Sequence, residues 1–151
     1  MDEENYKAAR AEIVPVPCVF EKAILAARVR CSKAKKMNLA QREVVRCAGS
    51  ECQTRCQAWL QIMREKSRFA LQLDSLENVS VPLPHGKEMR VQVGGIEGLS
   101  AVLAAKAPET ESGLADVFAM LDAGFAQYGS LAYLPFSELV KAVAHCRVRR
   151  G

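Results

Sequence analysis

The stretch Cys18-VFEKAILAARVR-Cys31-SKAKKMNLAQREVVR-Cys47-AGSE-Cys52-QTR-Cys56 carries five of the six cysteines of this 151-residue chain. The intervals of 12, 15, 4 and 3 residues contain no Cys-x-x-Cys pair, the motif of zinc ribbons and of thioredoxin-type redox proteins. The ferredoxin run of cysteines two residues apart is also absent. If these thiols act together, different structural elements must bring them to one place.

Hydrophobic periodicity predicts that helices carry this stretch. Phe20, Ile24 and Ala27 recur with Cys31 at i, i+4, i+7 and i+11, which is one face of a helix. Asn38, with Gln41 three residues later, resembles the start signal of a second helix. The expected helices run from Val19 to Lys36, from about Leu39 to Arg46 and from Glu51 to Leu73, with a break at 47–51 where Gly49 stops the second.

Outside this stretch the expectations are more varied. Residues 1–17 look like an extended arm that ends in Pro15-Val-Pro17. The segments 79–83 and 89–93 alternate as strands do, and the turn between them predicts a β-hairpin. The remaining expectations are a short helix at 99–106, a loop at 107–112, a helix at 114–128, a third strand at 131–133 and a last helix from Phe136 into the basic tail.

Length and composition place these elements in one small globular unit. The chain is long enough for one domain, and half of its residues are hydrophobic, so it can fill a core. The prediction is an α+β protein that is mainly helical. Residues 1–75 form a three-helix, cluster-binding cysteine module, and it packs on a smaller hairpin-plus-helices half, residues 76–151.

Charge is distributed unevenly along the chain. From Glu21 to Arg68 there are twelve Lys or Arg and four acids, a net charge of +8, whereas Phe69 to Ala144 carries −5. The basic segment contains most of the cysteines. Positive charge favours thiolates and offsets an anionic cluster, although a solvated helix face would also explain these bases.

The sequence also predicts a compartment. No segment reaches the ~20 apolar residues of a membrane span, and the acidic start lacks the pattern of a secretory signal. We therefore expect a cytoplasmic protein, and in that compartment clustered cysteines indicate metal or redox chemistry rather than disulfides.

The cysteine spacing favours one [4Fe–4S] cluster, because each of its irons needs just one thiolate and the ligands can come from separate elements. Cys31 and Cys56 are expected on inward helix faces, and Cys18 follows a rigid Pro-Val-Pro. Cys47, which is expected in a turn, is the preferred fourth ligand. Cys52, which shares a helical face with Cys56, is the alternative. The predicted ligands are therefore Cys18, Cys31, Cys47 and Cys56.

Such a cluster would serve electron transfer or redox sensing with a partner protein. No nucleophile–base pair, phosphate-binding glycine loop or small-molecule site is evident, so no enzyme is predicted. His85 and His145 are isolated, and Cys146 lies outside the module. Two alternatives remain: a zinc-stapled interaction module, and a basic helical nucleic-acid-binding regulator. The bases expected to contact phosphates are Arg28, Arg30, Lys33, Lys35, Lys36 and Arg42.

Overall fold

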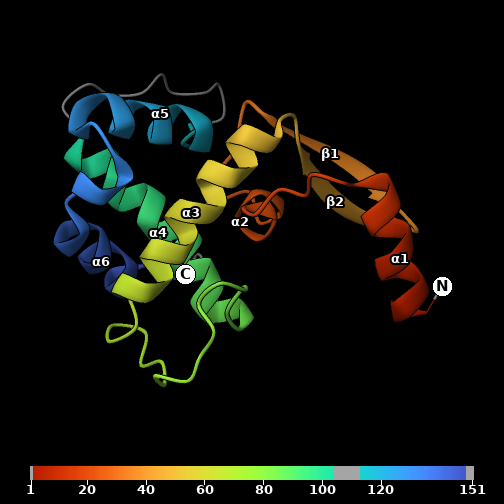
Figure 1. Ribbon diagram of the computed structural model, residues 1–151, viewed down its shortest axis with the longest axis horizontal. Helices are drawn as coiled ribbons and strands as arrows, with labels where there is room; N and C mark the ends of the chain where they lie inside the picture. Colours follow the sequence, from red (N-terminus) through yellow and green to blue (C-terminus); the bar gives the residue numbers. More distant parts are fainter. Residues whose placement is uncertain (1, 104–112, 149–151) are drawn as a thin grey trace.

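The computed structural model in Figure 1 describes residues 2–103 and 113–148. This part of the chain is a mixed α+β structure, dominated by helices and containing one two-stranded antiparallel sheet. Its elements are α1 (Glu3–Ile13), α2 (Glu21–Leu25), β1 (Ala34–Leu39), β2 (Arg42–Cys47), α3 (Ser50–Lys66), α4 (His85–Val102), α5 (Val117–Tyr128), the 3-10 turn η1 (Leu131–Tyr133) and α6 (Phe136–His145). None of the described helices is long and apolar enough to cross a membrane.

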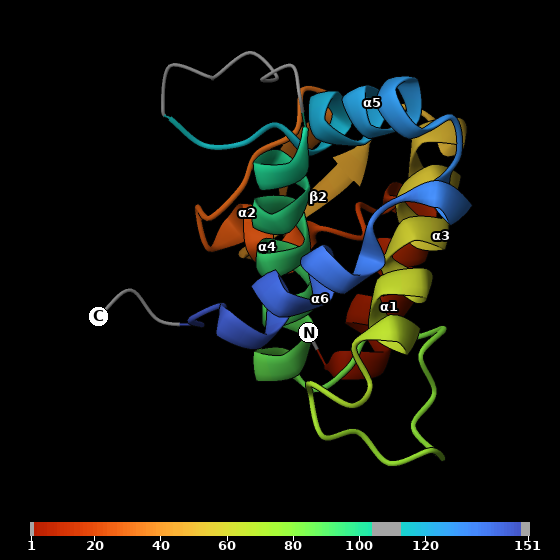
Figure 2. The same ribbon diagram turned by 90° about the vertical axis from the view of Figure 1, so that its left-hand side faces the viewer.

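The main hydrophobic core surrounds α4, which contacts α2, α3, α5 and α6 (Figure 2). Val91, Ile96 and Leu99 of this helix are fully buried, and the core also takes in residues of α2 and β2. Small residues permit the close approach of its neighbours. A Cβ atom on Gly94 would lie 2.8 Å from the Cα of Val143 in α6.

Gly94→Ala is expected to lower the free energy of unfolding by about 1–3 kcal/mol, because the added methyl meets α6 backbone atoms that cannot move aside cheaply. Gly86→Ala, in the first turn of the same helix, is the matched control, since its Cβ would meet nothing within 4 Å. That variant should be neutral or gain up to about 1 kcal/mol. Urea unfolding of both variants checks the difference, and equal stabilities would contradict the packing argument.

A second, smaller core joins α1 to the hairpin. Tyr6, Val14 and Val44 are buried together, with Met37 and Leu39 packed against them. The Arg42 guanidinium lies 4.0 Å from the centre of the Tyr6 ring and pairs with Glu3 at 3.0 Å. Figure 1 shows α1 and the two strands together at one side of the molecule.

The predicted extended arm is wrong, because residues 3–13 form α1. The Asp2 carboxylate accepts a hydrogen bond from the Asn5 N–H at 2.8 Å and caps the helix. The negative charges of Glu3 and Glu4 in the first turn interact favourably with the positive end of the helix dipole. Only Tyr6 of this helix is buried. The helix therefore lacks the repeating apolar face by which a helix is predicted from sequence.

The two helices predicted over 19–36 and 39–46 are also wrong. Only α2 is helical there; at Ala27 the φ angle is +57°, and the chain then enters the hairpin. Ala40 and Gln41 form its two-residue turn with φ angles of +50° and +67°, as in a type I′ turn. Such turns usually carry Asn or Gly, so the sequence lacked the expected signal. The bases proposed for nucleic-acid contact therefore do not share one helix.

The hairpin predicted at 79–83 and 89–93 is wrong as well. Residues 89–93 lie inside α4, and 79–83 have no regular structure. This helix is buried on most sides, so Glu88 and Gln92 are inside along with the apolar residues and the helical period is hidden. Residues 99–102 complete α4 rather than forming a separate helix, and Leu131–Tyr133 is a 3-10 turn rather than a strand. Residues 104–112, with the predicted loop, lie outside the described part.

Three predicted helices are confirmed in outline. The helix expected from Glu51 is α3, which begins at Ser50 but ends at Lys66, and Gly49 caps its start. The helix expected at 114–128 is α5, capped by the Asp116 side chain. The last helix, α6, begins at Phe136 as predicted and ends at His145.

Candidate metal centre

Five cysteines line one shallow recess of about 350 Å³, a volume that includes open solvent. They come from the link before α2, the loop before β1, the end of β2 and the first two turns of α3. Every one of these thiols is free and partly exposed. The lining cysteines are Cys18, Cys31, Cys47, Cys52 and Cys56, and the other lining residues are Val19, Phe20, Ala34, Gln53, Val117 and Phe118.

A short backbone ladder positions Cys18 and Cys47. The Cys18 N–H donates to the Val45 carbonyl at 2.9 Å, and the Cys47 N–H donates to the Val16 carbonyl at 2.8 Å. Pro17 pairs with Arg46 between them. In such antiparallel pairing, residues on either side of a central pair share one face, so both cysteine side chains leave the ladder on the same side.

Asp116 fixes the segment that carries Cys31. Arg30 forms a parallel β-bridge with Asp116. The Arg30 N–H donates to the Ala115 carbonyl at 2.9 Å, and the Val117 N–H donates to the Arg30 carbonyl at 2.8 Å. The Asp116 carboxylate accepts from the Ser32 N–H at 3.2 Å and also from an N–H in the first turn of α5. Cys31 therefore lies between Arg30 and Ser32, which are both hydrogen-bonded to residues 115–117. These bonds also place the start of α5 beside the recess.

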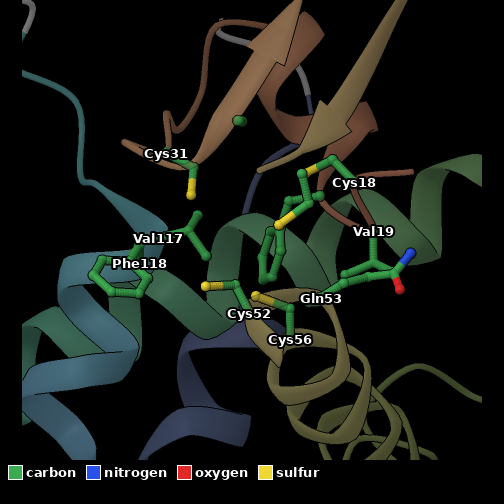
Figure 3. A pocket seen from close by; sticks show the side chains of 11 residues that line it. Cys18, Val19, Cys31, Cys52, Gln53, Cys56, Val117 and Phe118 are labelled. Atoms are coloured by element: carbon green, nitrogen blue, oxygen red, sulfur yellow. The ribbon is translucent and has the colours of Figure 1, made fainter. Parts of the chain in front are cut away.

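The remaining two cysteines project from the start of α3, one helical turn apart. Figure 3 shows the side chains of Cys52 and Cys56 pointing from this helix toward the space into which Cys31 points from the other side. The Gln53 side-chain amide donates to the Pro17 carbonyl at 2.8 Å and joins α3 to the backbone ladder. The Cys47 thiol donates to the Gly49 carbonyl at 3.2 Å, beside the N-terminus of α3.

Burial keeps the thiols of Cys18, Cys31 and Cys56 protonated. It raises the pKa of Cys18 and of Cys56 to about 12, and it also raises the pKa of Cys31. Backbone N–H groups oppose this effect, from Phe20 at Cys18 and from Lys33 and Phe118 at Cys31. These three thiols therefore need a nearby cation to become thiolates at neutral pH, which is what a bound metal supplies.

This protonation can be tested by alkylation of the metal-free protein. Below its pKa a thiol gains about tenfold in thiolate for each pH unit. We therefore expect the iodoacetamide rates of Cys18 and Cys56, mapped by mass spectrometry, to rise through pH 10 without a plateau, given a pKa of about 12. In urea, the alkylation rates of the same two residues should level off once the pH exceeds their ordinary pKa of about 8.5. A plateau at that pH in the folded protein would contradict the prediction.

Positive charge and an aromatic ring stand beside the recess. The Lys33 ammonium lies 4.9 Å, and the Arg55 guanidinium 5.0 Å, from the centre of the Phe118 ring. Arg55 lowers the pKa of the neighbouring Cys56, although burial outweighs it. The Nε of Arg55 is buried and has no hydrogen-bond partner in the described part of the chain. Arg55 also pairs with Asp122 at 3.4 Å, so its charge is only partly available to an anionic group in the recess.

The spacing of the thiols bears on what they can bind. In the described ranges, no three His, Cys, Asp or Glu side chains form a group that could hold a metal ion. A zinc ion requires four ligand atoms at about 2.0–2.3 Å from one centre. A cluster of several irons spreads its thiolates more widely, because each iron takes its own. The five thiols therefore line one recess without forming such a group in the described part of the chain.

Comparison with known proteins adds no assignment: no family model, curated protein or solved structure matches this chain. The case for a function therefore rests on the geometry of the recess itself.

The sequence-predicted ligands and their alternative, Cys52, are all brought to the recess, while their role as ligands remains a prediction. The reason given for Cys31 is wrong, since it lies in a loop and not on a helix face. Cys146 caps the end of α6, away from the recess, and neither histidine lines it. Sequence reasoning missed Asp116 and Phe118; the cap signal of an aspartate before an apolar helix was the available clue.

Proposed function

We propose that this chain is a small cytoplasmic iron–sulfur protein that binds one [4Fe–4S] cluster and acts in electron transfer or redox sensing with a partner protein. The observation that carries the proposal is the convergence of five free cysteines from four separate segments on one recess. Free thiols in this number suit a reducing compartment. The cytoplasmic location and the partner are parts of the proposal.

Different groups of the recess would have different roles in holding a cluster. Thiolates of Cys18, Cys31, Cys47 and Cys56 would each bind one iron, leaving no iron open to a substrate. Backbone N–H groups next to two of these sulfurs would stabilise their negative charge, and hydrogen bonds of this kind tune cluster potentials. When bound, the cluster would accept or release a single electron.

Cys47 is favoured over Cys52 as the fourth ligand. Cys47 lines the recess from the end of β2, and it is among the groups that raise the pKa of Cys18, of Cys31 and of Cys56. Cys52 lies in the first turn of α3, on the same helix as Cys56, and remains the alternative.

Metal and sulfide analysis tests the proposal. Protein purified without oxygen should be brown and contain about four iron and four acid-labile sulfide per chain. Stoichiometric zinc without sulfide would overturn the proposal in favour of the zinc-stapled interaction module. Protein that takes up neither metal, even after reconstitution with iron and sulfide, would exclude both.

A further inference from the structure

A second hollow, larger than the cysteine recess, separates α1 from α3. It contains about 1820 Å³ of space, part of it open to solvent. Lys7 and Arg10 of α1 line one side, Gln57 and Gln61 of α3 line another, and Lys22 enters from α2. It lies between the two hydrophobic cores, and such junctions are common positions for ligand sites.

The charges that line this cleft do not cancel. Its one acidic residue, Glu21, accepts from the Arg10 guanidinium at 3.0 Å and from the Val45 N–H at 2.8 Å. Arg64, at the cleft floor, is neutralised by Glu88 at 2.8 Å. Among the described residues, neither Lys7 nor Lys22 forms a salt bridge, although Lys7 helps to lower the pKa of Glu3 on the same helix. Two ammonium groups are therefore left to attract an anion.

The opposite wall offers hydrogen bonds rather than charge. Gln57 and Gln61 are exposed and lie one turn apart on α3, so their amides share the face that borders the cleft. An amide can both donate and accept, so this wall suits the oxygens and hydroxyl groups of a small polar molecule. Cys18 and Val19 border both hollows, so a molecule in the cleft would contact the segment that carries a predicted cluster ligand.

From this juxtaposition we infer that the cleft between α1 and α3 binds a small polyanion, bearing phosphate or carboxylate groups, through Lys7 and Lys22. The proposed ligand is held by Lys7 and Lys22 and not by a cysteine, although Cys18 lines both this cleft and the cysteine recess. Binding of the polyanion therefore does not require a bound cluster.

Titration calorimetry of the full chain at low salt tests the inference, with tripolyphosphate and citrate as probes. Saturable one-to-one binding of at least one probe is expected. Lys7→Gln combined with Lys22→Gln should weaken it by about tenfold or more, since charge-assisted contacts are lost. The matched control, Lys87→Gln with Lys141→Gln, removes the same charge outside the cleft and should change the dissociation constant by less than about twofold.

The outcomes separate the ligand classes. Binding of tripolyphosphate alone assigns a phosphate ligand, binding of citrate alone assigns a carboxylate, and both support the site. Equal weakening in the two double variants would show mere attraction to net charge and overturn the inference. Absence of saturable binding of both probes up to about 5 mM, a free energy near −3 kcal/mol or weaker, would overturn it as well. Because the experiment runs with or without a cluster, its failure leaves the iron analysis unaffected.

Discussion

Replacement of Glu88 by alanine is expected to lower the free energy of unfolding by about 3–5 kcal/mol. The Glu88 carboxylate is fully buried and accepts hydrogen bonds from Arg64 at 2.8 and 2.9 Å, from the Leu83 N–H at 2.9 Å and from Gln92 at 2.8 Å. Its removal leaves the Arg64 guanidinium, only 4% exposed, without a counter-charge. An uncompensated buried charge is among the most costly defects a core can carry.

Two further variants separate the buried pair from a general effect of charge. Glu138→Ala removes an exposed partner of Lys141, so it should cost less than about 1 kcal/mol. Arg64→Met combined with Glu88→Leu removes both charges and should be markedly more stable than Glu88→Ala alone. Denaturant unfolding measures all three, and a double variant less stable than the single one would contradict the explanation.

The second large effect is expected at the cysteine recess, and it rests on the proposed cluster. Cys18→Ser, Cys31→Ser and Cys56→Ser should each lose most of the bound iron, because serine is a poor ligand for iron here and an incompletely held cluster is exposed to oxygen. Cys146→Ser is the matched control, since it removes a thiol outside the recess and should retain full iron.

The same series decides the fourth ligand. We expect Cys47→Ser to lose the cluster and Cys52→Ser to keep it. The reverse result would exchange these two residues and leave the cluster proposal intact. Full iron and sulfide in all five recess variants would show that the thiols hold no cluster. Circular dichroism of each variant, compared with the parent protein, separates loss of the cluster from loss of the fold.

The sequence predicted those elements that carry their own signals. Helices α3, α5 and α6 each bury apolar residues that recur within the helix itself. The hairpin was missed because Ala40 and Gln41 adopt a turn that usually needs Asn or Gly. Helix α4 was misread because burial on most of its surface hides the helical period.

The convergence of the cysteines could be predicted from their crowding in the sequence, but their positions could not. The ladder that aligns Cys18 with Cys47 depends on pairing of residues 16–18 with residues 45–47. No local sequence pattern predicts this pairing. Likewise, Asp116 reaches the segment of Cys31 across more than eighty residues, as its contact with Ser32 shows. The division at residue 75 remains a prediction, although the main core draws on residues from both sides of it.

The tether between Asp116 and the Cys31 segment has a consequence for the timing of synthesis. A chain leaving the ribosome exposes all five recess cysteines long before residues 115–117 emerge to pair with Arg30. Until then Cys31 lacks the contacts that hold it in place, and the nascent site is open on the side that Val117 and Phe118 later cover. Domains generally fold as units as the chain emerges. Completion of the recess is therefore a late event that follows emergence of residues 115–117, and insertion of the proposed cluster would come after it.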